Sequence, residues 1–225
     1  MASLAEITTE TACVIAEPVQ AERGVRLPDK EWMKALRRRC DETGAMLILD
    51  EIQTGFGRTG SLWAFEQFGI VPDILLLGKA LGGGMPLGGF IVARERMLLL
   101  TLGPVLGHIT TFGGHPVCCA AGKAGMEVLL AESVIGLVEA KAALFRSLMQ
   151  HPRILELRTA GLIMAVEFDS FETNQRVFTA CLENGLVTDW FLFTPQYLRM
   201  APPLIIAETD IRKFCSIILE ACDRL

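Results

Sequence analysis

The stretch MLILDEIQTGFGRTGSLWAFEQFGIVPDILLLGKALGGGMPLGG, residues 46–89, decides the fold. It holds two short apolar runs, Met46–Leu49 and Ile74–Leu77, whose length and composition predict strands buried on both faces of a parallel sheet. Asp50 follows the first run directly, and Lys79 follows the second after a single glycine. Because ligands of open α/β sheets bind at the carboxyl ends of the strands, these charged residues indicate a site.

A carboxylate and a lysine buried at one sheet edge suit imine chemistry on a pyridine cofactor. A lysine amine must be neutral to attack an aldehyde, and burial or a neighbouring cation lowers its pKa enough for that. A carboxylate facing a pyridine nitrogen keeps the nitrogen protonated, so that the ring can accept the electrons of a carbanion. Asp50 and Lys79 therefore predict a site for such a cofactor.

The string LDEIQTGFGRTG, with Lys79 downstream in GKALGGGMPLGG, closely resembles the class III, or ω-amino acid, pyridoxal-phosphate aminotransferases of fold type I. Three further segments match in the family's order: AEPVQAERG at 16–24, TTFGGHP at 110–116 and LRMAPPLII at 198–206. The resemblance implies an α/β fold. It comprises part of the family's large domain, a mostly parallel sheet with helices on both faces, and a C-terminal α+β small domain.

The resemblance also implies a domain organisation. Residues 1–132 correspond to the C-terminal part of the cofactor-binding large domain, 133–152 to a connecting helix and 153–225 to the small domain. The family's N-terminal part supplies a Gly/Ser/Thr turn that binds the cofactor phosphate and an aromatic residue that stacks on the ring. Residues 1–12 contain neither. We therefore expect the chain to correspond to the C-terminal half of an aminotransferase.

The resemblance assigns cofactor-binding roles to five residues. Lys79 is implied to be the Schiff-base lysine, which holds pyridoxal phosphate and carries a proton, and Asp50 the partner of the pyridine nitrogen. Ile52 is implied to pack on the ring, Gln53 to bond near its phenolic oxygen, and Thr111 to donate to the cofactor phosphate of the neighbouring subunit. By themselves such residues more often serve as a loop acid, a solvated lysine, a core side chain or a turn hydroxyl.

Two further residues concern the substrate. Arg199 in LRMAPPL stands where the family binds the substrate's α-carboxylate, a group that the arginine fork holds bidentately. Glu22 in AEPVQAERG matches an acid that, in ornithine-type members, pairs with this arginine when substrate is absent. A surface arginine on an edge strand and a solvated loop acid are the alternatives. GFGRTG lacks the rest of a dinucleotide fingerprint, which disfavours a phosphate cradle. The resemblance implies that this stretch is a structured loop, which Arg58 anchors.

Apolar periodicity and helix-terminating residues predict the remaining elements. The predicted strands are Cys13–Ala16, Phe90–Ala93, the alternating stretch 155–168, and a pair within 197–206 split by Pro202–Pro203. The predicted helices are Asp29–Thr43, Pro116–Leu130, Val134–Met149, 171–185 and 208–225. After residue 153 strands and helices no longer alternate one for one, which predicts an α+β region.

Composition narrows the possible partners and the compartment. Hydrophobic residues make up 51% of the 225 residues, an excess that we interpret partly as an interface, in agreement with the homodimer that the resemblance implies. The net charge of −5 argues against a nucleic-acid partner. No apolar run reaches the roughly 18 residues of a membrane helix. Because Met1 is not followed by a secretory signal pattern, we expect a cytoplasmic location.

The seven cysteines include no CxxC pair, so neither disulfides nor a zinc site are expected. Cys118 and Cys119 are interpreted as small core residues of a helix. His108 and His115 lack a third ligand at a metal-binding spacing, so no metal is expected. The basic run at 37–40 is interpreted as the solvated face of an amphipathic helix.

The expected function is transfer of an amino group from an amino donor to a 2-oxo acid such as 2-oxoglutarate. An ω-amine is favoured as donor, as in ornithine, acetylornithine or 4-aminobutyrate, and aminomutase or decarboxylating chemistry on the same scaffold stays open. The alternative is a truncated or split, catalytically incomplete aminotransferase fragment that binds the cofactor weakly. A nucleotide-binding module is disfavoured, because the sequence has neither a dinucleotide fingerprint nor a P-loop.

Overall fold

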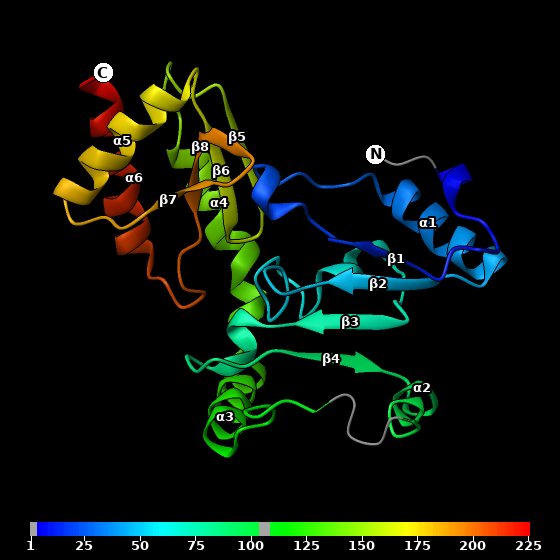
Figure 1. Cartoon of the computed structure of the whole chain (residues 1–225). Helices are drawn as coiled ribbons and strands as arrows, with labels where there is room; N and C mark the ends of the chain where they lie inside the picture. The colour runs from blue at the N-terminus through cyan, green and yellow to red at the C-terminus, as the bar shows by residue number, and fades with distance from the viewer. Residues whose placement is uncertain (1–3, 104–108) are drawn as a thin grey trace. The chain divides into compact units, whose positions relative to one another are not determined.

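The computed structural model describes residues 4–103 and 109–225 (Figure 1). The chain divides into two compact units, each assembled from separate segments. The first unit comprises Met1–Pro18, Pro28–Phe56 and Trp63–Glu132, and the second comprises Val19–Leu27, Gly57–Leu62 and Ser133–Leu225. Each unit contains a four-stranded sheet and a hydrophobic core of its own.

The sheet of the first unit is mixed, with the strand order β1-β2-β3-β4. Its strands are β1 (Cys13–Ala16), β2 (Met46–Asp50), β3 (Ile74–Leu77) and β4 (Gly89–Val92). β1, β2 and β3 run parallel, whereas β4 is antiparallel to β3, as its reversed arrowhead in Figure 1 shows. The four predicted strands of this region are confirmed.

Burial of this sheet is one-sided, which corrects the prediction of strands buried on both faces. Leu47 and Leu49 of β2 are fully buried, whereas the residues between and beside them are partly exposed. Successive side chains of a strand point to opposite faces, so one face of β2 meets the core. β1 departs further from a core strand, because it lies at the edge of the described sheet and its Ile15 is 63% exposed.

Helix α1 (Lys30–Thr43) covers the buried face. Asp29 caps its N-terminus by accepting two amide hydrogen bonds, at 2.9 and 3.0 Å, and Gly44 ends it in the left-handed conformation. The buried side of α1 adds three residues to the core that contains Leu47 and Leu49: Met33, Leu36 and Cys40. The predicted helix is confirmed, and it provides the crossover between the parallel strands β1 and β2.

The sheet of the second unit is antiparallel, with the order β5-β6-β8-β7. Its strands are β5 (Glu156–Ala160), β6 (Ile163–Glu167), β7 (Asp189–Phe191) and β8 (Thr194–Met200). Met164 and Val166 of β6 belong to a core shared with helices α4, α5 and α6. Ile163 and Ala165 pack on the other side, in a second core that includes residues of the segment 19–25. The sheet therefore has an apolar layer on each face.

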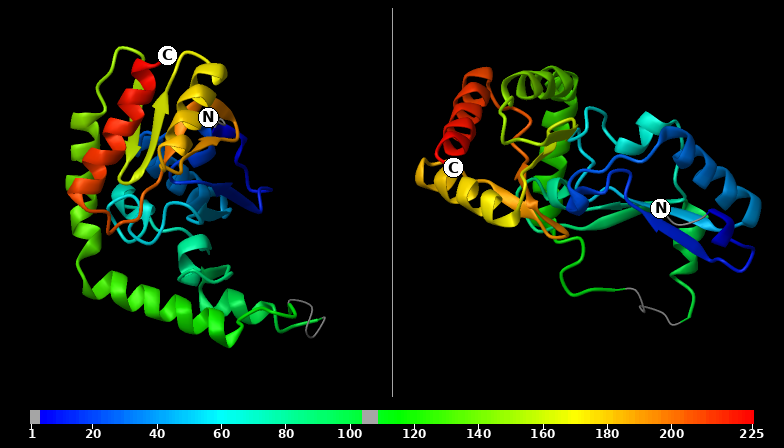
Figure 2. Two further views of the ribbon diagram at one scale, coloured as in Figure 1. Left: turned by 90° about the vertical axis from the view of Figure 1, so that its left-hand side faces the viewer. Right: turned by 90° about the horizontal axis from the view of Figure 1, so that it is seen from above.

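Four further helices agree with predicted ones: α3 (Pro116–Ala131), α4 (Val138–Leu148), α5 (Phe171–Glu183) and α6 (Glu208–Asp223). The last three can be followed in yellow-green, yellow and red in Figure 2. α4 begins four residues later than predicted, after the 3₁₀ turn Val134–Leu137, and the short helix α2 (Arg94–Leu99) was not predicted. The predicted break near Ser133 is present, because this residue has a φ of 51°. Within the described parts of the chain, no helix is long and apolar enough to cross a membrane.

Two further predictions, one for the segment 197–206 and one for the adjacent cysteines, are wrong. The segment 197–206 contains one strand, β8, which ends at Met200, and the prolines at 202 and 203 are not followed by a second strand. Proline has no amide hydrogen, so the ladder cannot continue through these positions. Of the two adjacent cysteines, Cys118 is buried as expected, but Cys119 is exposed.

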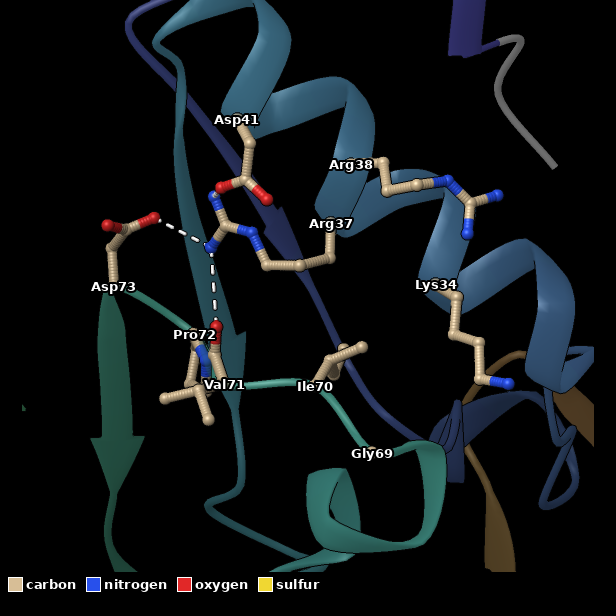
Figure 3. Close-up of a pocket in the computed structure, with 9 residues that line it drawn as sticks. All are labelled: Lys34, Arg37, Arg38, Asp41, Gly69, Ile70, Val71, Pro72 and Asp73. Atoms are coloured by element: carbon tan, nitrogen blue, oxygen red, sulfur yellow. Dashed lines mark hydrogen bonds and ion pairs between the residues drawn. The ribbon is translucent and has the colours of Figure 1, made fainter.

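The basic run at 37–40 is not simply a solvated face. Arg38 is exposed, but Arg37 is largely buried, and Arg39 donates to the carbonyl of Ile7 at 2.9 Å. Figure 3 shows Arg37 reaching from α1 to Asp73, the residue directly before β3, at 2.8 Å. Two of the three arginines therefore hold the helix to neighbouring segments.

Asp73 joins three segments of the first unit. Its carboxylate accepts from the Leu47 amide of β2 at 2.9 Å and pairs with Arg37 of α1 at 2.8 Å and Arg96 of α2 at 2.7 Å. Burial by itself would raise the pKa of Asp73. The Leu47 amide and the two guanidinium groups outweigh that effect and lower the pKa to about 2.

Replacing Asp73 by Asn is expected to lower the free energy of unfolding of the first unit by roughly 2 kcal/mol at pH 7. Because folding lowers the pKa of this carboxyl, the stability that it contributes is complete above about pH 4 and is lost as the pH falls towards 2. Urea unfolding followed by fluorescence of Trp32 and Trp63 measures both effects. The control is Asp41→Asn, which removes the exposed partner of Arg37. An equal loss in both variants would contradict the assignment.

Candidate functional site

The parallel pairing of β2 and β3 places two predicted site residues at one sheet edge. Asp50 is the last residue of β2 and lies opposite Leu76 in the ladder. β3 ends at Leu77, and Lys79 follows after Gly78. Asp50 is half-buried, but Lys79 is exposed, so the expected burial of the lysine is not observed. The carboxylate and the amine extend from neighbouring strand ends.

Lys79 has an unusual backbone conformation. Its φ is +45°, in the left-handed region that residues other than glycine, asparagine and aspartate rarely adopt. It begins the short 3₁₀ helix η4 (Lys79–Gly82). Such a conformation costs about 1–3 kcal/mol and persists only where the surrounding structure imposes it, often at functional sites. The strain therefore marks Lys79 as a candidate functional residue.

Helix α3 fixes the segment that carries Lys79. A Cβ atom on Gly122 of α3 would lie 2.3 Å from the carbonyl oxygen of Leu81 in η4. A Cβ on Gly83 would likewise lie 2.3 Å from the carbonyl oxygen of Ala121. The two backbones are thus in direct contact, which only glycine permits at these positions.

Ile52 lies beside the lysine segment. A Cβ built on Gly78 would lie 3.2 Å from Cγ2 of Ile52, so this side chain covers the glycine directly before Lys79. Asp50 Oδ1 accepts a hydrogen bond from the Ile52 amide at 2.9 Å, which orients the carboxylate, and Gln53 follows half-buried in the same turn. An acid, an amine and a branched apolar side chain at one edge fit a pyridine cofactor that carries an aldehyde.

Thr111 is exposed in the segment that precedes α3. The segment enters the helix through His115, whose Nδ1 accepts from the Val117 amide at 3.3 Å, and through Pro116 in the first turn. His108 lies outside the described residues. In the described ranges, no group of three or more His, Cys, Asp or Glu residues could hold a metal ion.

Sequence reasoning missed Glu51, which is completely buried. Its carboxylate accepts from the amides of Ala64 and Phe65, both at 2.8 Å, and from the Thr54 hydroxyl at 3.0 Å. Burial raises the pKa of Glu51, and these three donors oppose the increase. The bonds tie the end of β2, with Asp50 and Ile52, to the first turn of η3 (Ala64–Phe68). The DE dipeptide gave no signal of this, because the donors lie across a loop.

The second unit brings together the two residues predicted to concern the substrate. Arg199 of β8 pairs with Glu22, with 3.0 Å between Nη1 and Oε1, and both side chains are mostly buried. The Arg199 guanidinium lies over the Phe191 ring at 5.4 Å, within cation–π range. Glu22 Oε2 also accepts from the Leu192 amide at 3.1 Å. The acid and the arginine thus form an ion pair supported by neighbouring groups.

Arg58, in the segment 57–62, is largely buried and donates from Nη1 to the carbonyls of Leu162 at 3.0 Å and Pro202 at 2.5 Å. The prediction that Arg58 anchors its loop is confirmed. Burial lowers the pKa of Arg58, and the positive charge of Arg199 lowers it further.

Comparisons with known proteins agree with this architecture. The model of the class-III aminotransferase family matches residues 1–222. An acetylornithine aminotransferase of Methanosarcina acetivorans is 36% identical over 96% of this chain and 53% of its own length. The ornithine aminotransferase of Toxoplasma gondii is 33% identical over 95% of this chain and 51% of its own, with a TM-score of 0.86. A Bacillus anthracis aminotransferase, 28% identical, covers 99% of this chain and 54% of its own, with a TM-score of 0.89.

The chain therefore belongs to the class III aminotransferase family. Its fold is the α/β fold of the type I pyridoxal-phosphate-dependent members, with a mixed sheet in the first unit. The chain spans about half the length of the curated relatives it matches.

Replacing Glu51 by Gln is expected to lower the free energy of unfolding by about 1–3 kcal/mol. Glutamine keeps the volume, but its amide nitrogen would face a backbone N–H that needs an acceptor. Denaturant unfolding measures the loss, and hydrogen exchange at the amides of Ala64 and Phe65 should accelerate. The matched control is Glu66→Gln, because the exposed Glu66 accepts from the Trp63 amide in the same turn at 3.2 Å. If the two variants behave alike, Glu51 is not the anchor.

Proposed function

We propose that this chain provides the catalytic lysine and the carboxylate clamp of a pyridoxal-phosphate-dependent transaminase. The transaminase moves an amino group from a donor, with an ω-amine favoured, to a 2-oxo acid such as 2-oxoglutarate. The observation that carries the proposal is the pairing of β2 with β3, which sets Asp50 and a conformationally strained Lys79 at one sheet edge. The relatives include acetylornithine and ornithine aminotransferases, and the Toxoplasma structure has pyridoxal phosphate at partial occupancy in its active site.

The residues of the first unit have distinct proposed roles toward the cofactor. Pyridoxal phosphate, when bound, supplies a ring that accepts the electrons of a carbanion. Asp50 would hold a proton on the pyridine nitrogen, and its own orientation is fixed by the Ile52 amide. Lys79 Nζ would hold the cofactor and later carry the proton removed from the substrate's Cα. Ile52 would pack on the ring, and Gln53 would bond near its phenolic oxygen.

Thr111 is proposed to act across a subunit interface, on the cofactor phosphate of a second copy. Its exposure in the described segment is consistent with such a role. The homodimer is part of the same proposal, and exposed apolar residues of the first unit support it: Leu98, Leu99, Leu102, Phe112, Val117 and Leu130. The domain assignment (1–132, 133–152 and 153–225) and the cytoplasmic location, given by the sequence features above, also belong to this proposal.

Arg199 is proposed to bind the substrate's α-carboxylate and Glu22 to hold Arg199 until the carboxylate arrives. A guanidinium fork binds a planar carboxylate through two hydrogen bonds, and an ionised partner roughly doubles their strength. The ion pair with Glu22 keeps the guanidinium oriented and compensates its charge while no substrate is bound. Exchange of one carboxylate for another would therefore require little reorganisation.

The alternative is a fragment that lacks part of the catalytic machinery. Its support is that the chain covers 53% of the acetylornithine aminotransferase and 51% of the Toxoplasma enzyme. In that case the 225 residues bind pyridoxal phosphate weakly and catalyse no transamination by themselves.

Incubation with pyridoxal phosphate followed by borohydride reduction is expected to attach the cofactor covalently to Lys79. Peptide mass spectrometry locates the adduct, and Lys79→Ala should abolish it. The control variant is Lys123→Ala, because Lys123 is an exposed lysine of α3. Asp50→Asn should lower the yield, because the pyridine nitrogen loses its anionic partner.

Labelling spread over several lysines, and equal in the wild type and Lys79→Ala, would contradict the role of Lys79. Selective labelling of Lys79 without transfer of an amino group to 2-oxoglutarate would favour the incomplete fragment. Selective labelling with transfer would support the transaminase.

A further inference from the structure

Arg58 acts where the β6–β8 ladder ends. The two strands are antiparallel, with Ala165 opposite Arg199 and Met164 opposite Met200. Continued by two residues, this register sets Leu162 opposite Pro202. Proline has no amide hydrogen to donate, so the ladder stops there. The Arg58 guanidinium donates to the carbonyls of both Leu162 and Pro202, and so joins the two strand ends in place of a ladder bond.

The backbone of Arg58 is fixed as firmly as its side chain. Its carbonyl accepts from the Leu162 amide at 2.9 Å. A Cβ on Gly161 would lie only 2.5 Å from the same carbonyl oxygen, so the turn between β5 and β6 is in direct backbone contact with Arg58. Because both ends of the residue are held, its guanidinium has little freedom to move away from the strand ends.

The positive charges of Arg58 and Arg199 act on each other. Within the described residues, Arg58 has no carboxylate partner. Its side chain donates to the carbonyls of Leu162 and Pro202. Arg199 has the Glu22 carboxylate at 3.0 Å, and its own charge disfavours the charged form of Arg58. Like charges favour a guanidinium of Arg199 that points away from Arg58 and toward the Glu22 carboxylate.

We propose that Arg58 is a positioning residue for Arg199. It fixes the spacing of β6 and β8 three residues beyond Arg199, and its charge directs the Arg199 guanidinium toward an anion. That anion is Glu22 in the free protein and a substrate carboxylate in the complex. The statement about the substrate carboxylate rests on the proposed carboxylate-binding function of Arg199.

The test follows the side-chain Nε–H signal of Arg199 by ¹H–¹⁵N NMR of the whole chain, assigned by its loss in Arg199→Lys. Glutarate, a dicarboxylate without a reactive carbonyl, is the titrated ligand. The variants are Arg58→Met, which removes the charge and both hydrogen bonds, and Arg58→Lys, which keeps the charge. Arg212→Met, at an exposed arginine of α6, controls for the loss of one positive charge in the same unit.

Arg58→Met is expected to shift the Arg199 signal in the free protein and to weaken glutarate binding by about tenfold or more, since small misplacement of a binding group is costly. Arg58→Lys should bring the Arg199 signal and the glutarate affinity partly back to their wild-type values. Arg212→Met should change neither the signal nor the affinity. A stabilising role alone would lower the unfolding temperature without the selective shift of Arg199.

An unchanged Arg199 signal and glutarate affinity within about twofold of wild type in a folded Arg58→Met protein would overturn the proposal. If Arg58→Met does not fold, Arg58→Lys decides by the same readouts, and unfolding of both variants would also overturn it. If the wild-type chain does not respond to glutarate, the proposed substrate role of Arg199 fails. The positioning role is then judged from the Arg199 signal of the free variants.

Discussion

The parallel pairing of β2 with β3 is the constraint on which the candidate site depends. Parallel strands bring their carboxyl ends to one edge, so residues far apart in the sequence become neighbours only if this pairing and its register are kept. The register sets Asp50 opposite Leu76, which leaves Lys79 just beyond the same edge. The crossover helix α1 and the one-sided apolar core hold the pairing, and α3 closes on the lysine segment through glycine contacts.

Buried or half-buried charges fix the loops of both units, and backbone groups satisfy much of their bonding capacity. Glu51 accepts from two amides and Arg58 donates to two carbonyls, while Asp73 combines one amide with two arginines. A buried charge without partners would be costly, so each of these side chains specifies one loop position and penalises others. These bonds therefore hold the irregular segments beside the strands in defined positions.

The sequence allowed most of the regular elements to be predicted, because their signals are local, but the short elements α2 and β7 were missed. Apolar runs, caps and breakers marked β2, β3 and α1, and alternation marked the stretch that forms β5 and β6, without knowledge of their neighbours. The one-sided burial of β2, the partners of Arg37 and the bonds of Glu51 could not be predicted, since they depend on segments far away in the chain. The motif containing Arg58 indicated an anchor, but its acceptors at the end of β8 required the sheet register.

The second unit is discontinuous in sequence, and this has a consequence for how the chain can fold. The core on one face of its sheet contains Val19, Ala21 and Val25 together with Phe191 and Tyr197, which are synthesised much later. Closing that core joins residues separated by most of the chain, and contacts of such long range slow folding. During synthesis the first unit can complete its core before the sheet of the second unit, on which the segment 19–25 packs, has been made. An excised piece beginning at Ser133 would expose the apolar face that this segment covers.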